Sequence, residues 1–70
     1  MDEQLRLIAQ RILALREIAG ASEEAVAAAL QLPADSYRRY ERGEADIPVS
    51  VLHRLAQFFG VELSALLTGE

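Results

Sequence analysis

Apolar positions near the start of the chain recur at alternating steps of three and four residues, which places them along one side of a helix. This stripe consists of Leu5, Ile8, Ile12, Leu15 and Ala19. The pattern predicts an amphipathic helix from Asp2 to Ile18. Asp2 is its predicted N-cap, and Gly20 is the predicted left-handed residue that ends it.

Two further helices are predicted in the middle of the chain. Ser22 is a predicted N-cap, and the run AVAAAL behind it favours a short helix that ends near Leu30. Pro33 suits the first position of the next helix, where its missing N–H has no intrahelical partner. That helix, in the segment PADSYRRYERG, is predicted to end at Gly43 as a left-handed cap.

Two more helices are predicted in the last third. The fourth follows Pro48 and ends at Gly60. Its apolar stripe consists of Leu52, Leu55, Ala56 and Phe59. A short fifth helix precedes Gly69, and its apolar side consists of Leu63, Leu66 and Leu67. The sequence contains no strand pattern, repeat or linker, so it predicts an all-α fold of five helices in one domain over residues 1–70.

Length and composition exclude several classes of function. Seventy residues suffice for one domain but leave no room for an enzyme with its own substrate pocket. The chain has no cysteine, and its single histidine, His53, has no second ligand at metal spacing, so His53 is expected on the surface. No nucleophile with an adjacent base and no glycine-rich phosphate loop can be assembled. We expect no catalytic residue, no metal and no cofactor.

The start of the chain, MDEQLRLIAQ, is acidic and then amphipathic, unlike a signal peptide. No apolar run approaches the roughly 20 residues that a membrane span needs. We therefore expect a cytoplasmic protein with no membrane partner.

Charge gives two opposing indications. The formal net charge is −4, which argues against nucleic-acid binding because phosphate neutralisation supplies most non-specific affinity. All seven basic residues are arginines, however, and three of them, Arg38, Arg39 and Arg42, lie in the third predicted helix. The local field there can be positive on an acidic body.

The third predicted helix has two distinct sides. At about 100° per residue, Tyr37 and Tyr40 lie on a core side. The opposite arc holds Ala34, Asp35, Arg38, Arg39 and Arg42. A helix of this kind, preceded by a short turn and another helix, suits the major groove of B-DNA, which is about 12 Å wide.

The short side chains at the start of this helix, Ala34, Asp35 and Ser36, would permit close approach to DNA. Arg38 or Arg39 could donate hydrogen bonds to guanine or to a phosphate. The same pattern also fits a solvated face on which acidic neighbours balance the arginines, and periodicity alone leaves both interpretations open.

The stretch ASEEAVAAALQLPADSYRRYERG, from Ala21 to Gly43, resembles the helix-turn-helix of Cro/C1-type (XRE) repressors. The matching positions are Ser22, Val26, Ala27, Leu30, Leu32, the sequence ERG at 41–43, Pro48, Leu52, Leu55, Ala56, Val61, Leu66 and Leu67. In addition, YERGEADIP followed by LLTGE is similar to XRE regulators that carry a cupin sensor domain directly after this module. The resemblance leaves two alternatives open: this chain is part of a longer regulator with a C-terminal sensor domain that is absent from this chain, or it is a stand-alone domain.

The resemblance implies a compact, lambda-repressor-like domain whose helix-turn-helix unit spans about 22–43, formed by the second and third helices. It implies an internal ion pair between Arg16 and Glu41, which makes Glu41 structural. It also implies base or phosphate contacts at several positions on these two helices. The DNA-binding residues predicted from the pattern and the resemblance together are Ser22, Glu23, Ala34, Asp35, Ser36, Arg38, Arg39 and Arg42.

The chain departs from the family pattern by being acidic where relatives are not. Glu23 stands where members commonly have a glutamine that donates to a phosphate, and the loop after the third helix contains Glu44 and Asp46. Asp35 could accept from a cytosine amino group, but the cap of its own helix is the preferred interpretation. These departures predict weak affinity, and hence a homodimer on a palindromic operator in double-stranded DNA.

The sequence thus predicts a sequence-specific DNA-binding transcriptional regulator, or the DNA-binding domain of one. The alternative is a protein-interaction module that keeps the helix-turn-helix fold without DNA affinity, because fold does not dictate function.

Overall fold

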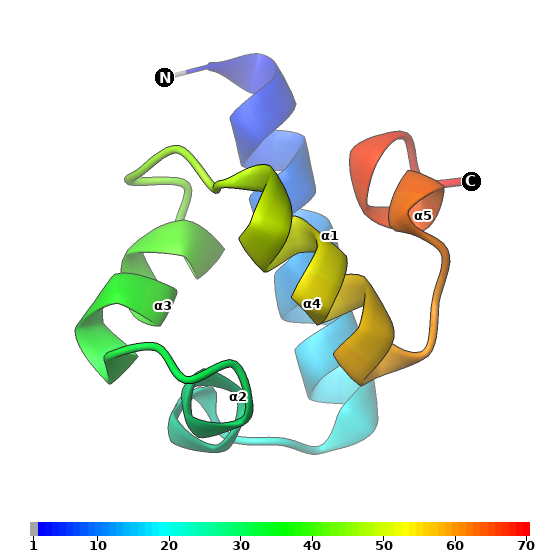
Figure 1. Ribbon diagram of the computed structural model, residues 1–70. Helices are drawn as coiled ribbons and strands as arrows, with labels where there is room; N and C mark the ends of the chain where they lie inside the picture. The colour runs from blue at the N-terminus through cyan, green and yellow to red at the C-terminus, as the bar shows by residue number, and fades with distance from the viewer. Residues whose placement is uncertain (1) are drawn as a thin grey trace.

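The computed structural model describes residues 2–70, which form five α-helices joined by short turns (Figure 1). The helices are α1 (Glu3–Ala19), α2 (Glu23–Ala29), α3 (Ala34–Glu41), α4 (Val49–Phe59) and α5 (Leu63–Leu67). These residues contain no strand. The predicted all-α fold with five helices is therefore confirmed.

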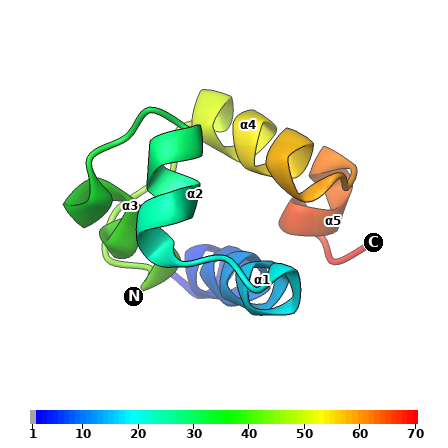
Figure 2. The same cartoon turned by 90° about the horizontal axis from the view of Figure 1, so that it is seen from below.

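The longest helix, α1, organises the others because it contacts α3, α4 and α5. The two short helices α2 and α3 pack on each other across the turn that joins them. In Figures 1 and 2, α3 and α5 lie at opposite sides of the molecule, with α1 and α4 between them. The outer side of α3 therefore faces away from the body of the domain.

Each helix contributes one completely buried side chain to a single core. These residues are Ile12, Val26, Tyr37, Leu55 and Leu66. The stripe predicted for α1 is correct at Ile8 and Ile12, and Leu15 packs against the core, but Ala19 at its end is exposed. The core is thus assembled from all parts of the sequence.

Four of the five helices end in the same hydrogen-bonded turn, in which a left-handed residue allows two backbone N–H groups to reach back into the last helical turn. The left-handed residues that end α1, α3 and α4 are Gly20, Gly43 and Gly60. The left-handed conformation was predicted for Gly20 and Gly43, and the helix end for Gly60. After α2 the same position holds Gln31, with a φ of 59°. The N–H groups of Gln31 and Leu32 donate to the carbonyl oxygens of Ala28 and Ala27.

Replacing Gln31 by glycine is expected to stabilise the domain by about 0.5–1 kcal/mol. A left-handed backbone costs a residue with a side chain roughly 1–2 kcal/mol, whereas the added freedom of glycine in the unfolded chain offsets only part of this gain. Gln31 is exposed, so its side chain loses little packing. Thermal or urea unfolding measures the change.

The matched control is Gln10→Gly at an exposed position inside α1, which should destabilise by about 1 kcal/mol because glycine is a poor helix former. A loss of stability in Gln31→Gly would contradict the strain assigned to the turn.

Two predictions about helix starts are confirmed and two are wrong. The side chains of Asp2 and Ser22 accept hydrogen bonds from the N–H groups of Gln4 and Ala25, as N-caps of α1 and α2 do. Pro33, predicted as the first helical residue of α3, is instead its N-cap, with a non-helical ψ of 140°. Asp35 is not a cap either, because it already lies inside the first turn.

Within residues 2–70 the structure contains no helix whose length and hydrophobicity would let it span a bilayer.

Candidate nucleic-acid interface

The inner side of α3 is anchored by Tyr37, which is completely buried, and by the partly buried Tyr40, as predicted for both. The outer side carries Asp35, Arg39 and Arg42, all exposed. The short turn at residues 30–33 sets α3 against α2, so side chains in the first turn of α2 reach Arg38 in the middle of α3. The structure therefore presents α3 with a fixed inner side and an accessible, charged outer side.

Arg38 does not project freely from this surface. Its guanidinium contacts three carboxylates: Nε lies 3.4 Å from Glu23 Oε1, Nη1 lies 2.9 Å from Asp35 Oδ1, and Nη2 donates to Glu24. The hydrogen bond to Glu24 raises the pKa of Arg38 above its usual value. The pKa of Glu24 is lowered, first by its own backbone N–H and then by Arg38. We call these four residues the Arg38 cluster.

Arg39 and Arg42 are the arginines of α3 and its C-cap that extend into solvent. Among residues 2–70 neither side chain has an ion pair or hydrogen bond with another residue. The loop that follows is acidic, as the sequence indicates, with Glu44 and Asp46 exposed. Any positive potential on the outer side of α3 therefore comes from Arg39 and Arg42.

The remaining arginines stabilise the fold. Arg6 pairs with Glu3 along α1. Arg11 donates to the carbonyl oxygens of Leu66 and Leu67 at the end of α5, each at 3.1 Å, and Arg54 donates to that of Leu30 at the end of α2. Such contacts satisfy helix carbonyls that lack an intrahelical partner. Only local pairs such as Arg6 with Glu3 leave a signal in the sequence.

The expected ion pair between Arg16 and Glu41 is present and is bidentate. Arg16 Nε and Nη2 each lie 2.8 Å from an oxygen of Glu41, and Arg16 Nη1 donates to the carbonyl oxygen of Ala21. The Tyr37 hydroxyl donates to Glu41 at 2.5 Å. Glu41 is only 6% exposed. This buried network fixes α3 to α1, and hence the direction in which Arg39 and Arg42 point.

Alkaline pH is expected to weaken the fold through Tyr37. Burial, and then its hydrogen bond to Glu41, raise the pKa of Tyr37 well above the ordinary value of 10.0. The neutral phenol is favoured in the folded state, so its contribution to stability is complete below pH 10 and declines as the pH rises further. The free energy of unfolding should fall by up to about 1.4 kcal/mol per pH unit there, as measured by urea unfolding.

The comparison that isolates this effect is Tyr37→Phe, which should remove the extra decline above pH 10, whereas Tyr40→Phe should keep it. An equal alkaline decline in wild type and Tyr37→Phe would show that another group is responsible.

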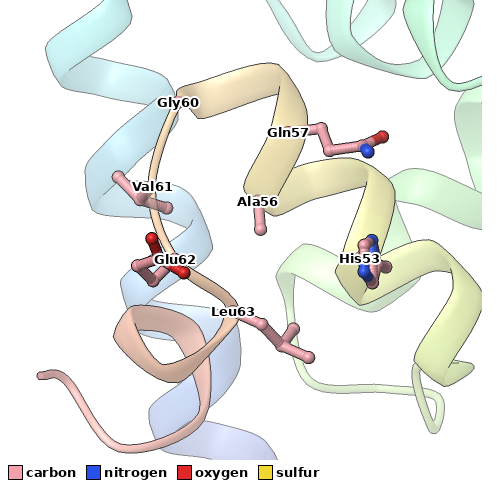
Figure 3. A pocket seen from close by; sticks show the side chains of 7 residues that line it. All are labelled: His53, Ala56, Gln57, Gly60, Val61, Glu62 and Leu63. Atoms are coloured by element: carbon pink, nitrogen blue, oxygen red, sulfur yellow. The ribbon is translucent and has the colours of Figure 1, made fainter.

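A surface hollow of about 460 Å³ lies between α4 and α5, where Leu63 extends from the start of α5 toward α4 (Figure 3). Its rim carries the exposed residues His53, Gln57 and Glu62. The surface location predicted for His53 is thus confirmed. No group of three metal-ligating side chains occurs within residues 2–70. The charged surface of α3 belongs to a different part of the molecule.

Comparisons with known proteins agree with this geometry. A family model described as a helix-turn-helix domain matches residues 7–67. Among solved structures, the chain is similar to the restriction-modification controller protein C.AhdI from Aeromonas hydrophila, with a TM-score of 0.83 and 27% sequence identity over 89% of this chain and 94% of that chain. A search of curated proteins finds no match. The chain belongs to the helix-turn-helix domain family, in agreement with its resemblance to Cro/C1-type (XRE) proteins.

Proposed function

We propose that this chain is a non-enzymatic, DNA-binding transcriptional regulator, or the DNA-binding domain of one, and that α3 enters the major groove of its operator. The observation that carries the proposal is the outer side of α3, on which Arg39 and Arg42 are exposed and unpaired among the described residues. The similarity to a restriction-modification controller protein supports a regulatory role. The protein would act where the DNA is, in agreement with the expected cytoplasmic location.

The dimensions of α3 suit this role. Its eight residues span about 12 Å, comparable with the width of the major groove. Ala34 and Ser36 have short side chains at the start of the helix and permit close approach. Arg39 can donate to guanine or to a phosphate, and Asp35, which does not cap its helix, has an oxygen that can accept from a cytosine amino group.

The N-terminus of α2 contributes in a different way. The Ser22 oxygen accepts from the N–H of Ala25, so its hydroxyl hydrogen remains able to donate to a phosphate. Glu23 repels phosphate, but its charge is opposed by Arg38. DNA affinity would therefore come from few groups in each copy of the chain.

The proposal includes a homodimer on a palindromic operator. With Arg39 and Arg42 as the available cations, one copy neutralises few phosphates. Two copies that contact half-sites one helical turn apart, about 34–36 Å, gain affinity by acting together. Sedimentation of the free protein and of its DNA complex tests the stoichiometry.

The experiment that tests the function is selection of random-sequence duplexes at low salt, followed by sequencing of the retained DNA. Wild type should enrich a palindrome, and Arg39→Ala/Arg42→Ala should lose the enrichment. The matched control is Gln57→Glu/Ser64→Glu, which lowers the net charge by the same two units at exposed positions on α4 and α5 and should retain it.

Failure of wild type to retain any duplex would contradict DNA binding. The protein-interaction module would then be favoured, and the exposed apolar side chains Ile18, Val49 and Phe58 would be its first candidate contacts.

A further inference from the structure

We propose that Arg38 is an internal counter-ion of the DNA-facing surface and not itself a DNA contact: it offsets part of the negative charge of Glu23, Glu24 and Asp35, so that phosphates can approach Arg39 and Arg42. This role rests on the proposed DNA-binding function. It assigns Arg38 a positioning role that differs from the base or phosphate contact expected from the sequence.

The geometry of the Arg38 cluster carries this inference. Each of the three guanidinium nitrogens faces a different carboxylate: Nε faces Glu23, Nη2 faces Glu24 and Nη1 faces Asp35. A bidentate contact with guanine or phosphate uses two donors of one guanidinium. Every nitrogen of Arg38 is thus shared with a carboxylate, and a contact with DNA would compete with these ion pairs.

Exposure points the same way. The side chains of Arg38 and Glu23 are 28% and 24% exposed, whereas those of Glu24 and Asp35 are 64% and 93% exposed. An approaching phosphate would thus meet carboxylates before it met the guanidinium. Arg38 is less exposed than Glu24 and Asp35 and reduces their field, which suits a counter-ion better than a side chain that contacts bases.

The net charge of the surface formed by α2 and α3 depends on Arg38. The surface formed by α2 and α3 carries three carboxylates in the Arg38 cluster and the three guanidinium groups of Arg38, Arg39 and Arg42. It is neutral with Arg38 and negative without it. Because Glu23 and Glu24 belong to α2 and Arg38 to α3, the same contacts also link the first turn of α2 to the middle of α3.

The test is a double-mutant cycle on DNA affinity. Arg38→Ala is made in the wild type and in the variant Glu23→Gln/Glu24→Gln/Asp35→Asn, where no carboxylate needs neutralising. In the wild type the substitution should weaken binding by about tenfold, the size of a coupled charge interaction. In the neutral variant it should change affinity by less than about twofold. Circular dichroism verifies that each protein is folded.

Two controls complete the design. Glu17→Gln/Glu62→Gln/Glu70→Gln removes the same number of exposed carboxylates outside α2 and α3, so it separates the local effect from that of net charge. Arg38→Lys keeps the positive charge without the three-pronged geometry, and it should retain most of the affinity even if Arg38→Ala folds poorly.

An equal loss of affinity in both backgrounds, with a salt dependence shallower by about 1.8 for the dimer (about 0.9 for each copy), would show that Arg38 contacts a phosphate and would overturn the counter-ion role alone. Absence of DNA binding in every protein, including the neutral variant, would overturn the DNA-binding function together with it.

Discussion

Glu41→Ala is expected to destabilise the domain by about 3–5 kcal/mol, because it leaves the guanidinium of Arg16 without its partner in a largely buried position. The same change removes the acceptor of the Tyr37 hydroxyl, which lies in the core. A domain of this size has a total stability of only about 5–10 kcal/mol. The melting temperature should therefore fall by at least about 12 °C, as followed by circular dichroism.

The control for this prediction is Glu17→Ala, an exposed residue of α1 whose loss should change stability by less than about 0.5 kcal/mol. A second variant, Arg16→Met/Glu41→Leu, replaces both charges by apolar groups and should recover much of the stability that Glu41→Ala loses. A cost below about 1 kcal/mol for Glu41→Ala would mean that water reaches Arg16 and that the pair is not an energetic anchor of α3.

Wild-type DNA affinity is expected to depend on salt with a slope of log K against log salt no steeper than about −4. If each copy offers Arg39 and Arg42 and Arg38 remains in its cluster, a dimer neutralises at most four phosphates, at about −0.9 per phosphate. Affinity should then fall about 100-fold between 50 and 200 mM salt. Titration of a labelled operator over this range measures the slope.

The variant Arg39→Ala/Arg42→Ala should bring this slope close to zero, while Gln57→Glu/Ser64→Glu should leave it nearly unchanged because these residues lie on α4 and α5. A wild-type slope near −10 would require many more phosphate contacts than α3 offers, and would mean that other basic groups, such as Arg6 or Arg54, leave their present partners on binding.

Features encoded by neighbouring residues were predictable from the sequence. Three left-handed glycines and two polar N-caps define half of the ten helix ends, and apolar periodicity identifies residues of the core. The left-handed conformation of Gln31 was not predicted, because it depends on the packing of α2 against α3 and not on the preference of glutamine. The predicted helical position of Pro33 was wrong by one residue because its fixed φ suits the N-cap as well as the first helical position.

The candidate site was predictable only in part. The spacing of Asp35 and Arg38 could have suggested their pair, because residues three apart on a helix are neighbours. The contacts of Arg38 with Glu23 and Glu24 could not be read from spacing, since they depend on the turn that brings α2 to α3. For the same reason, an arc of three arginines on a helical projection overstated the free positive charge.

Because each helix contributes one completely buried residue to the core, the helix-turn-helix segment is not expected to fold without the other helices. A peptide confined to residues 22–43 would lack Ile12, Leu55 and Leu66, and helices of seven and eight residues do not persist alone in water. The buried amides of α3 should therefore exchange their hydrogens with solvent only when the whole domain opens. The segment that would meet DNA therefore depends for its shape on core residues that lie outside it in the sequence.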